Sequence, residues 1–166
     1  MLAVAQSGEI SGYYRESQGE GVTKTCSFFL AGSASSDQVR IISGAGKSVP
    51  GMLMSEGDGA VLKIEKGREL PGCGLVLIPE IAQGITLSRT FEANWVMLRR
   101  IASPKAYFFR GPTAQQRLNA YLVKGDVVGV LSESDDWLNV EYVGNSGNSR
   151  TTGWIRSKDC EDLFAP

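Results

Sequence analysis

The chain has 166 residues, a mass of 17.9 kDa and an apolar content of 42%, which suits one compact domain or two small ones and excludes a large multidomain enzyme. Its 17 basic and 18 acidic residues give a net charge of −1, so no broad positive field attracts nucleic acid or an anionic membrane. Histidine is absent, which excludes Ser-His-Asp and Cys-His catalysis and removes the commonest metal ligand.

The first residues of the chain are small and apolar. Ala3-Val4-Ala5 has the A-x-A form of a signal-peptidase site, so this segment is either the end of an export signal or an ordinary N-terminus. No apolar run reaches the roughly 20 residues that a membrane helix needs. We therefore predict a periplasmic or secreted protein without membrane insertion.

Short β-rich runs separated by glycine recur along the whole chain, which predicts an all-β protein. In the first part the predicted strands are Val22 to Leu30, Gln38 to Ile42, Gly51 to Met54, Ala60 to Ile64, Leu75 to Ile78, Ile85 to Ser88 and Asn94 to Ile101. Their spacing indicates a β-barrel or sandwich. Residues 91–100 also have helical apolar spacing, and we favour a strand because Trp95 to Leu98 is a continuous apolar run.

Three cysteines, Cys26, Cys73 and Cys160, allow three different single disulfides. We predict Cys26–Cys73, because both fall in the first part of the chain and Cys73 lies in the turn-like Pro71-Gly72-Cys73-Gly74. In an oxidising compartment this bridge would stabilise the fold by roughly 4 kcal/mol. In the cytosol both would instead be buried thiols. The spacing of the cysteines predicts no metal site.

The segment Gly44-Ala45-Gly46-Lys47-Ser48 ends like a phosphate-binding loop. The full motif requires a glycine where Ile41 stands, and Pro50-Gly51 prevents the helix that would have to follow. We interpret the segment as a glycine-rich β-turn and predict no nucleotide or other cofactor.

The pattern restarts near Ala102-Ser103-Pro104, because proline interrupts a strand ladder. We place a domain boundary there, with domains at 1–102 and 103–166. The strands predicted beyond it are Ala106 to Phe109, Ala120 to Leu122, Asp126 to Ser132, Trp137 to Tyr142, Thr152 to Ile155 and Cys160 to Leu163. Strands this short in about sixty residues must curl around one core, which predicts a small barrel.

The second domain contains a series of short motifs in a fixed order, which are Ala106-Tyr107-Phe108-Phe109, Pro112, Ala120 to Asp126, Val130-Leu131, Trp137, Val140, Tyr142, Gly153-Trp154-Ile155 and Asp162-Leu163. Over about sixty residues, this series resembles the bacterial SH3 family. The resemblance implies an SH3-like barrel that binds without catalysis, since these modules dock cell-wall peptides or proteins. The hairpin after Tyr142 is longer than usual, and Asp159-Cys160-Glu161 interrupts the approach to the last Asp-Leu.

Aromatic side chains on different predicted strands of this domain form the candidate site. In an SH3-like fold they can line a shallow groove flanked by carboxylates, which suits an extended peptide carrying a cation. The predicted ligand-binding residues are Tyr107, Trp137, Tyr142, Asp135 and Asp136. The alternative is that at least two of the rings of Tyr107, Phe109, Trp137 and Tyr142 belong to the core, Phe109 before Trp137 or Tyr142.

The sequence thus predicts a non-catalytic binding protein of the bacterial cell envelope, whose partner is a peptidoglycan peptide or a protein. One alternative is an inhibitor or immunity protein that inserts a loop, such as Gly44 to Gly51 or Gly144 to Thr151, into a wall-degrading enzyme or toxin. A third interpretation is a hydrolase that uses paired carboxylates, Glu56 with Asp58 or Asp135 with Asp136.

Overall fold

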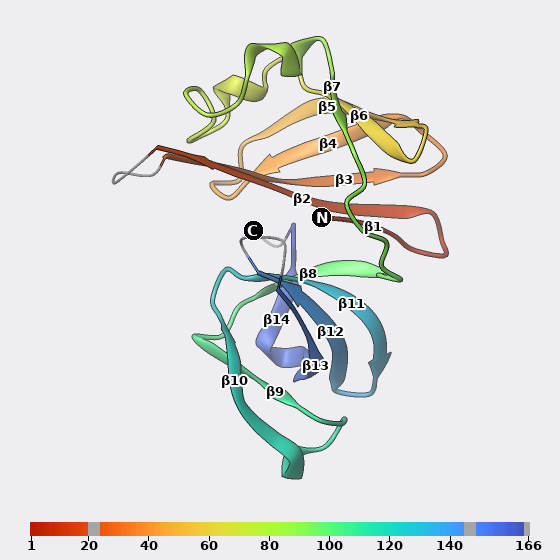
Figure 1. Ribbon diagram of the computed structural model, residues 1–166, viewed down its shortest axis with the longest axis vertical. Coiled ribbons are helices and arrows are strands. Elements are labelled where there is room, and N and C mark those ends of the chain that lie inside the picture. The colour runs from red at the N-terminus through yellow and green to blue at the C-terminus, as the bar shows by residue number, and fades with distance from the viewer. Residues whose placement is uncertain (20–23, 145–148, 165–166) are drawn as a thin grey trace. The chain divides into compact units, whose positions relative to one another are not determined.

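The computed structural model describes residues 1–19, 24–144 and 149–164. The chain divides into two compact units, and the main division falls between Ala93 and Asn94. Each unit is built on one curled antiparallel sheet, and each sheet has seven strands over the described residues (Figure 1). The predicted all-β class is confirmed.

The first sheet is a meander whose strands pair in chain order, from β1 to β7. Its strands are β1 (Leu2–Val4), β2 (Glu9–Gln18), β3 (Lys24–Ser33), β4 (Gln38–Ser43), β5 (Ser48–Glu56), β6 (Gly59–Lys63) and β7 (Ile85–Leu87). Ala3 and Val4 of the A-x-A motif thus lie in β1, and Ala5 directly follows this strand. The glycine-rich segment after β4 is the tight turn into β5, and Lys47 Nζ donates to the Glu69 carbonyl at 3.0 Å.

Strand β2 was not among the predicted strands, although it forms ten register pairs with β3. Its sequence is mostly polar, and its stability comes from cross-strand ring pairs. Tyr14 stacks on Phe28 with the ring centroids 4.7 Å apart, and on the other face Tyr13 stacks on Phe29 at 5.5 Å. These pairs exist only once the two strands are in register, so the isolated sequence of β2 does not indicate them.

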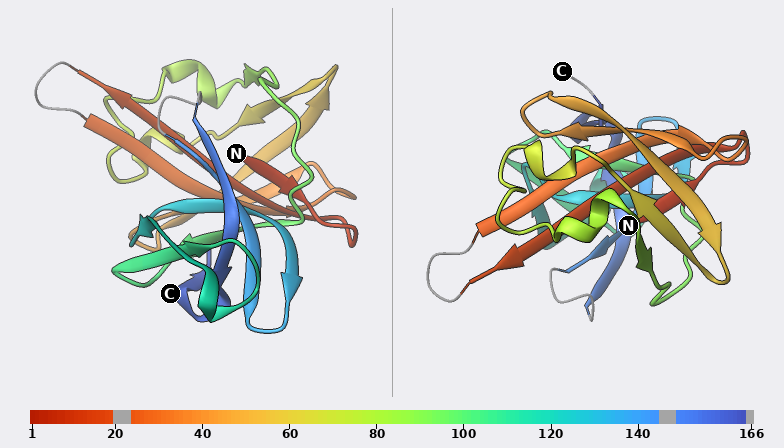
Figure 2. Two further views of the ribbon diagram at one scale, coloured as in Figure 1. Left: turned by 60° about the horizontal axis from the view of Figure 1, so that its bottom comes forward. Right: turned by 90° about the horizontal axis from the view of Figure 1, so that it is seen from above.

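The connection between β6 and β7 covers one face of the first sheet, as Figures 1 and 2 show (yellow-green ribbon). It contains two short 3₁₀ helices, η1 (Gly67–Glu69) and η2 (Pro79–Ala82). Its buried side chains join those of the strands in one hydrophobic core, which includes Phe28, Ile41, Leu62, Ile64, Leu70, Val76, Leu77 and Ile81. The predicted disulfide Cys26–Cys73 is present within this core and ties the connection to β3.

The predicted strand Leu75 to Ile78 is wrong, because this segment is a series of turns. The amide groups of Val76 and Leu77 both donate to the Cys73 carbonyl. Val76 and Leu77 are adjacent and both buried at 2% exposure, while Leu75 and Ile78 point outward. A strand with one covered face would alternate instead.

The second sheet has the strand order β10-β9-β13-β12-β11-β8-β14. Its strands are β8 (Met97–Ile101), β9 (Lys105–Phe109), β10 (Arg117–Val123), β11 (Val127–Ser134), β12 (Trp137–Val143), β13 (Arg150–Arg156) and β14 (Cys160–Asp162). Two 3₁₀ helices, η3 (Ala114–Gln116) and η4 (Ser157–Asp159), lie in its connections. Residues 91–96 are irregular and Met97–Ile101 is a strand, so the helical alternative for this region is wrong.

Strand β8 belongs to the second sheet, because it pairs with β11 on one side and β14 on the other. The division after Ala93 therefore falls earlier than the expected boundary at 102–103. Proline at 104 marks the turn between β8 and β9 rather than a junction between units.

Two glycines of the second unit lie at positions where a side chain would not fit the backbone. Gly125 has a φ of 94° in the turn after β10, a conformation that a side chain would strain. A Cβ at Gly153 would lie 2.9 Å from the Phe108 ring, so only glycine allows this close passage. Val128, Val130, Val140 and Ile155 are buried in the core of this unit.

Candidate functional site

Strands β9, β10, β12 and β13 carry a row of rings on the sheet face opposite the core. On β9, Ala106 and Phe108 are buried in the core, so alternation turns Lys105, Tyr107 and Phe109 to the other face. Register pairs extend this face across the neighbouring strands. We call it the aromatic face; its rings are Tyr107, Phe109, Tyr121, Trp137 and Trp154.

The rings of the aromatic face contact one another in two pairs. Tyr107 lies opposite Tyr121 in the register, with the ring centroids 5.6 Å apart and tilted by 59°. Phe109 and Trp137 meet edge to face at 4.8 Å and 77°. Trp154 is on β13, which lies between β9 and β12 in the sheet. In the register it is directly across from Phe109 on β9 and from Asn139 on β12. Tilted and edge-to-face contacts are favourable ring arrangements.

Among the described residues, three cations lie over these rings. Lys105 Nζ is 4.5 Å from the Tyr121 centroid, the Arg117 guanidinium carbon is 4.6 Å from the Tyr107 centroid, and that of Arg156 is 4.8 Å from the Trp137 centroid. Each distance is within the range of a cation–π contact. The aromatic face therefore combines apolar rings with positive charge.

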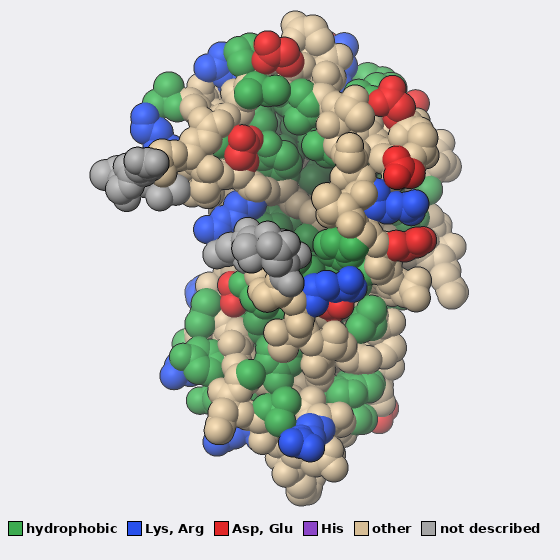
Figure 3. Space-filling view, viewed as in Figure 1, with side chains coloured by type: hydrophobic (Ala, Val, Ile, Leu, Met, Phe, Trp, Pro, Cys, Tyr) green, Lys and Arg blue, Asp and Glu red, His purple; other side chains and the backbone are tan. Residues whose placement is uncertain are grey.

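Exposure varies along the aromatic face. Phe109 and Trp137 are buried, at 6% and 9% exposure, although neither belongs to the hydrophobic core of this unit. Tyr121 and its neighbour Val123 are 45% and 46% exposed. The end formed by β9 and β10 is thus accessible to a ligand, and hydrophobic and basic side chains lie together on the surface of this unit (Figure 3).

Four of the five predicted ligand residues lie either on the aromatic face or in the turn that precedes Trp137. Tyr107 and Trp137 share the aromatic face. Asp135 and Asp136 are exposed in the turn between β11 and β12, immediately before Trp137. The Asp136 carbonyl accepts a hydrogen bond from the Ser157 amide at 2.8 Å.

Tyr142 lies on the other side of the sheet, where it packs against the core of the second unit. Trp137 and Tyr142 belong to the same strand and are an odd number of residues apart, so their side chains point to opposite faces. Tyr121, Trp154 and the three cations are the residues of this face that the sequence analysis did not assign to the site. Side chains alternate along a strand, so counting from the buried Leu122 on β10 and Ile155 on β13 could have placed Tyr121 and Trp154 on the opposite face.

Beyond the aromatic face, a buried carboxylate organises the far end of β12. Glu141 is 7% exposed; its Oε2 accepts from Trp95 Nε1 at 3.0 Å, and both its oxygens accept from Arg150 at 2.8–2.9 Å. Hydrogen bonding to Glu141 raises the pKa of Arg150. This carboxylate is fully engaged in holding Trp95 and Arg150.

The other sequence candidates form no compact site among the described residues. Glu56 and Asp58 are exposed at the turn between β5 and β6, where Glu56 accepts a hydrogen bond from Thr86. No group of three or more Cys, Asp or Glu residues in the described ranges is arranged to hold a metal ion. Of the loops considered for an inhibitor, Gly44 to Gly51 is a tight turn and the start of β5, and 145–148 lies outside the described residues.

No family model, curated protein or solved structure matches the chain. Within the described parts of the chain, no helix is long and apolar enough to cross a membrane.

Proposed function

We propose that the chain is a non-catalytic binding protein of the bacterial cell envelope and that its second unit, as an SH3-like module, binds cell-wall peptide through the aromatic face. The observation that supports this most is the accessible end of that face, where Tyr107 and Tyr121 lie under Arg117 and Lys105. Rings supply contact area at a low cost in side-chain entropy, and the cations favour a ligand with negative charge.

The charge of the face suggests which ligand groups it would take. Lys105, Arg117 and Arg156 cover ring faces that a ligand cation would otherwise occupy. An extended peptide with carboxylates therefore complements this surface better than the cation-bearing peptide expected from the sequence.

A periplasmic or secreted location fits the disulfide of the first unit. Cys26 and Cys73 are bonded in the core, with neither sulfur exposed. Disulfides of this kind persist in oxidising compartments and are rare in the cytosol.

The proposal is tested by co-sedimentation of the purified protein with peptidoglycan sacculi. Arg117→Ala and Tyr121→Ala should each lower the bound fraction at least about fivefold, corresponding to roughly 1 kcal/mol per lost contact. Lys124→Ala is the matched control, because it removes one exposed cation from the turn that follows β10 and leaves the face intact. Equal binding by Arg117→Ala and Lys124→Ala, or no binding by the wild type, would contradict the proposal.

A further inference from the structure

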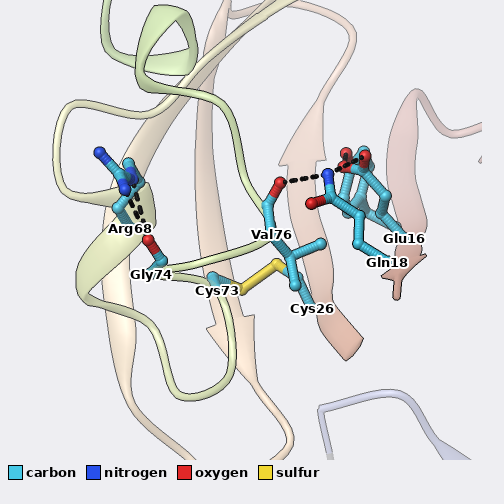
Figure 4. The surroundings of a disulfide bond; sticks show 8 residues. Glu16, Gln18, Cys26, Arg68, Cys73, Gly74 and Val76 are labelled. Atoms are coloured by element: carbon cyan, nitrogen blue, oxygen red, sulfur yellow. Dashed lines mark hydrogen bonds between the residues drawn. A yellow bond between two sulfur atoms is a disulfide. The ribbon is translucent and has the colours of Figure 1, made fainter. Parts of the chain in front are cut away.

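One face of the first sheet is covered by the connection between β6 and β7. Figure 4 shows how this connection is fixed to the strands: Cys73 is bonded to Cys26 on β3, and Gln18 Nε2 on β2 donates to the Val76 carbonyl at 2.9 Å. The side chains between the connection and the strands form the core of the unit. A ligand of this sheet would therefore have to bind on the opposite face, which we call the outer face.

Strand β4 places an arginine in the middle of the outer face. Ile41 is buried in the core, so alternation along the strand turns Arg40 to the other side. Register pairs put Ala31 of β3 and Pro50 of β5 directly on either side of Arg40. Both neighbours have short side chains, so the surface is low around the arginine.

A hollow of about 620 Å³ lies at this place. Pockets for small ligands have volumes of roughly 300–1,000 Å³, so the hollow is large enough for a small molecule. The side chains of the outer face that line it are Ala31, Gln38, Arg40, Ser48 and Pro50.

The polar side chains of the hollow are not engaged within the described part of the chain. No hydrogen bond or ion pair among the described residues involves the side chain of Gln38, Arg40 or Ser48. By contrast, Lys47 and Lys63 of the same unit each lie beside a glutamate. A guanidinium, an amide and a hydroxyl with unused donors therefore line one hollow.

The charge of the lining indicates the group that the hollow would bind. Among the described residues that line it, Arg40 is the only one with a charge. A planar guanidinium can donate two parallel hydrogen bonds to a carboxylate. One cation balances one negative charge, which favours a carboxylate over a phosphate that carries close to two.

The rest of the lining indicates the body of the ligand. Ala31 and Pro50 present apolar atoms on both sides of Arg40, and Met52, the next residue of β5 on the outer face, is 37% exposed. Strand β4 lies between β3 and β5, so its backbone groups are used in the sheet. A peptide would find no main-chain partner here, whereas an apolar body needs none.

We infer that the outer face of β3, β4 and β5 binds a small organic acid, with its carboxylate on the Arg40 guanidinium and its apolar body against Ala31 and Pro50. Gln38 and Ser48 supply further donors beside the carboxylate. This site lies in the first unit and does not depend on peptide binding by the aromatic face.

The test titrates the isotope-labelled full chain with octanoate and follows its amide NMR signals. Saturable shifts should concentrate on residues 38–42 and 48–52, with a Kd of about 1 mM or tighter. Acetate, which lacks the apolar body, should bind at least about tenfold more weakly. Octyltrimethylammonium, which carries the opposite charge on the same alkyl chain, should give no saturable shift in these segments.

Substitutions separate the carboxylate contact from the apolar one. Arg40→Gln should weaken octanoate binding at least about tenfold, and Arg40→Lys, which keeps the charge but loses the paired donors, about threefold. Ala31→Leu fills part of the hollow and should weaken binding about tenfold. Lys24→Gln is the matched control, because it removes an exposed cation from the other end of β3. Urea unfolding followed by circular dichroism checks that each variant is folded.

Three results of these titrations would overturn the inference: no saturable shift with octanoate, equal affinity for octyltrimethylammonium, or equal effects of Arg40→Gln and Lys24→Gln. Shifts that concentrate on β9 and β10 would also overturn it, because they would assign the acid to the aromatic face. Acetyl-Ala-Leu carries the carboxylate at the end of a peptide and should bind more weakly than octanoate. Tighter binding of this peptide that depends on Arg40 would overturn the inference in favour of a chain terminus.

Discussion

The two units cover the concave side of a curled sheet by different means. In the first unit an irregular connection lies over the sheet, and the Cys26–Cys73 disulfide fastens it. In the second unit the core is filled by side chains of the strands themselves, and its cysteine, Cys160, is a free thiol. The comparison teaches that irregular backbone needs a covalent tie where regular strands need only packing, so the first unit alone should depend on redox conditions.

The largest expected effect is loss of the disulfide. Replacing Cys26 and Cys73 together by serine opens a loop with a sequence separation of 47, which should lower the free energy of unfolding of the first unit by about 4 kcal/mol. All three tryptophans, Trp95, Trp137 and Trp154, lie in the second unit. In urea unfolding, the transition followed by tryptophan fluorescence should therefore be unchanged. Far-UV circular dichroism should show a separate transition of the first unit at a lower urea concentration than in the wild type. A joint shift of both transitions would contradict the comparison.

The next effect is the reverse case, a change that damages the second unit only. A Cβ at Gly129 would lie 2.4 Å from atoms of the Trp95 ring, which covers this glycine of β11. Gly129→Ala should lower the free energy of unfolding by roughly 2 kcal/mol, because the ring must move away from Glu141. The tryptophan transition should move to lower urea while the other stays in place. Gly44→Ala, in an open turn with no atom near its Cβ position, is the control.

A smaller effect is expected at Tyr14, whose Oη donates to Glu16 Oε2 at 2.6 Å. Tyr14→Phe keeps the stack on Phe28 and should destabilise the first unit by about 1 kcal/mol. Burial, and then the hydrogen bond to Glu16, raise the pKa of Tyr14. Because the folded state holds this proton more tightly, its contribution is fully present below pH 10 and falls as the pH rises above it.

The pH dependence of this effect is checked by urea unfolding between pH 9 and pH 11. The wild type should lose more stability over this range than Tyr14→Phe. The exposed Tyr121→Phe on the other unit is the control. Equal slopes for the wild type and Tyr14→Phe would show that the phenol is not held in this way.

The last prediction concerns the reactivity of the Cys160 thiol rather than the free energy of unfolding. Burial raises its pKa from 9.0 to about 12, so at pH 8 its alkylation in the folded protein should be about a thousandfold slower than that of a free thiol. Mass spectrometry should find one alkylated cysteine after unfolding in urea without reductant, and three after reduction. Three labels without reductant would exclude the disulfide, and rapid labelling of the folded protein would exclude the buried thiol.

The sequence predicted most strands of both units, because their alternating apolar residues and glycine turns are local signals. It failed at β2, whose ring pairs with β3 arise only in the folded sheet. It also failed at Leu75 to Ile78, since an apolar run alone does not distinguish a strand from a turn pinned by a disulfide.

The candidate site was predicted in part, from the types of residue rather than from their geometry. Tyr107 and Trp137 were assigned to the site and share one face, but Tyr142 points to the core. The cations over the rings could not be foreseen, because Arg117 meets Tyr107, and Lys105 meets Tyr121, only through the register of β9 and β10. Strand register is set by the whole sheet and not by the strand's own sequence.

The central claim, that the aromatic face binds wall peptide, is tested most directly by titrating the isotope-labelled protein with a peptidoglycan stem tetrapeptide and following its amide NMR signals. Saturable shifts should concentrate on β9, β10 and β13, with the indole signal of Trp154 among them. The side-chain signals of Tyr142, on the core side of the sheet, and the amide signals of the first unit should not shift. Shifts confined to other strands, or no shift at millimolar peptide, would contradict the claim.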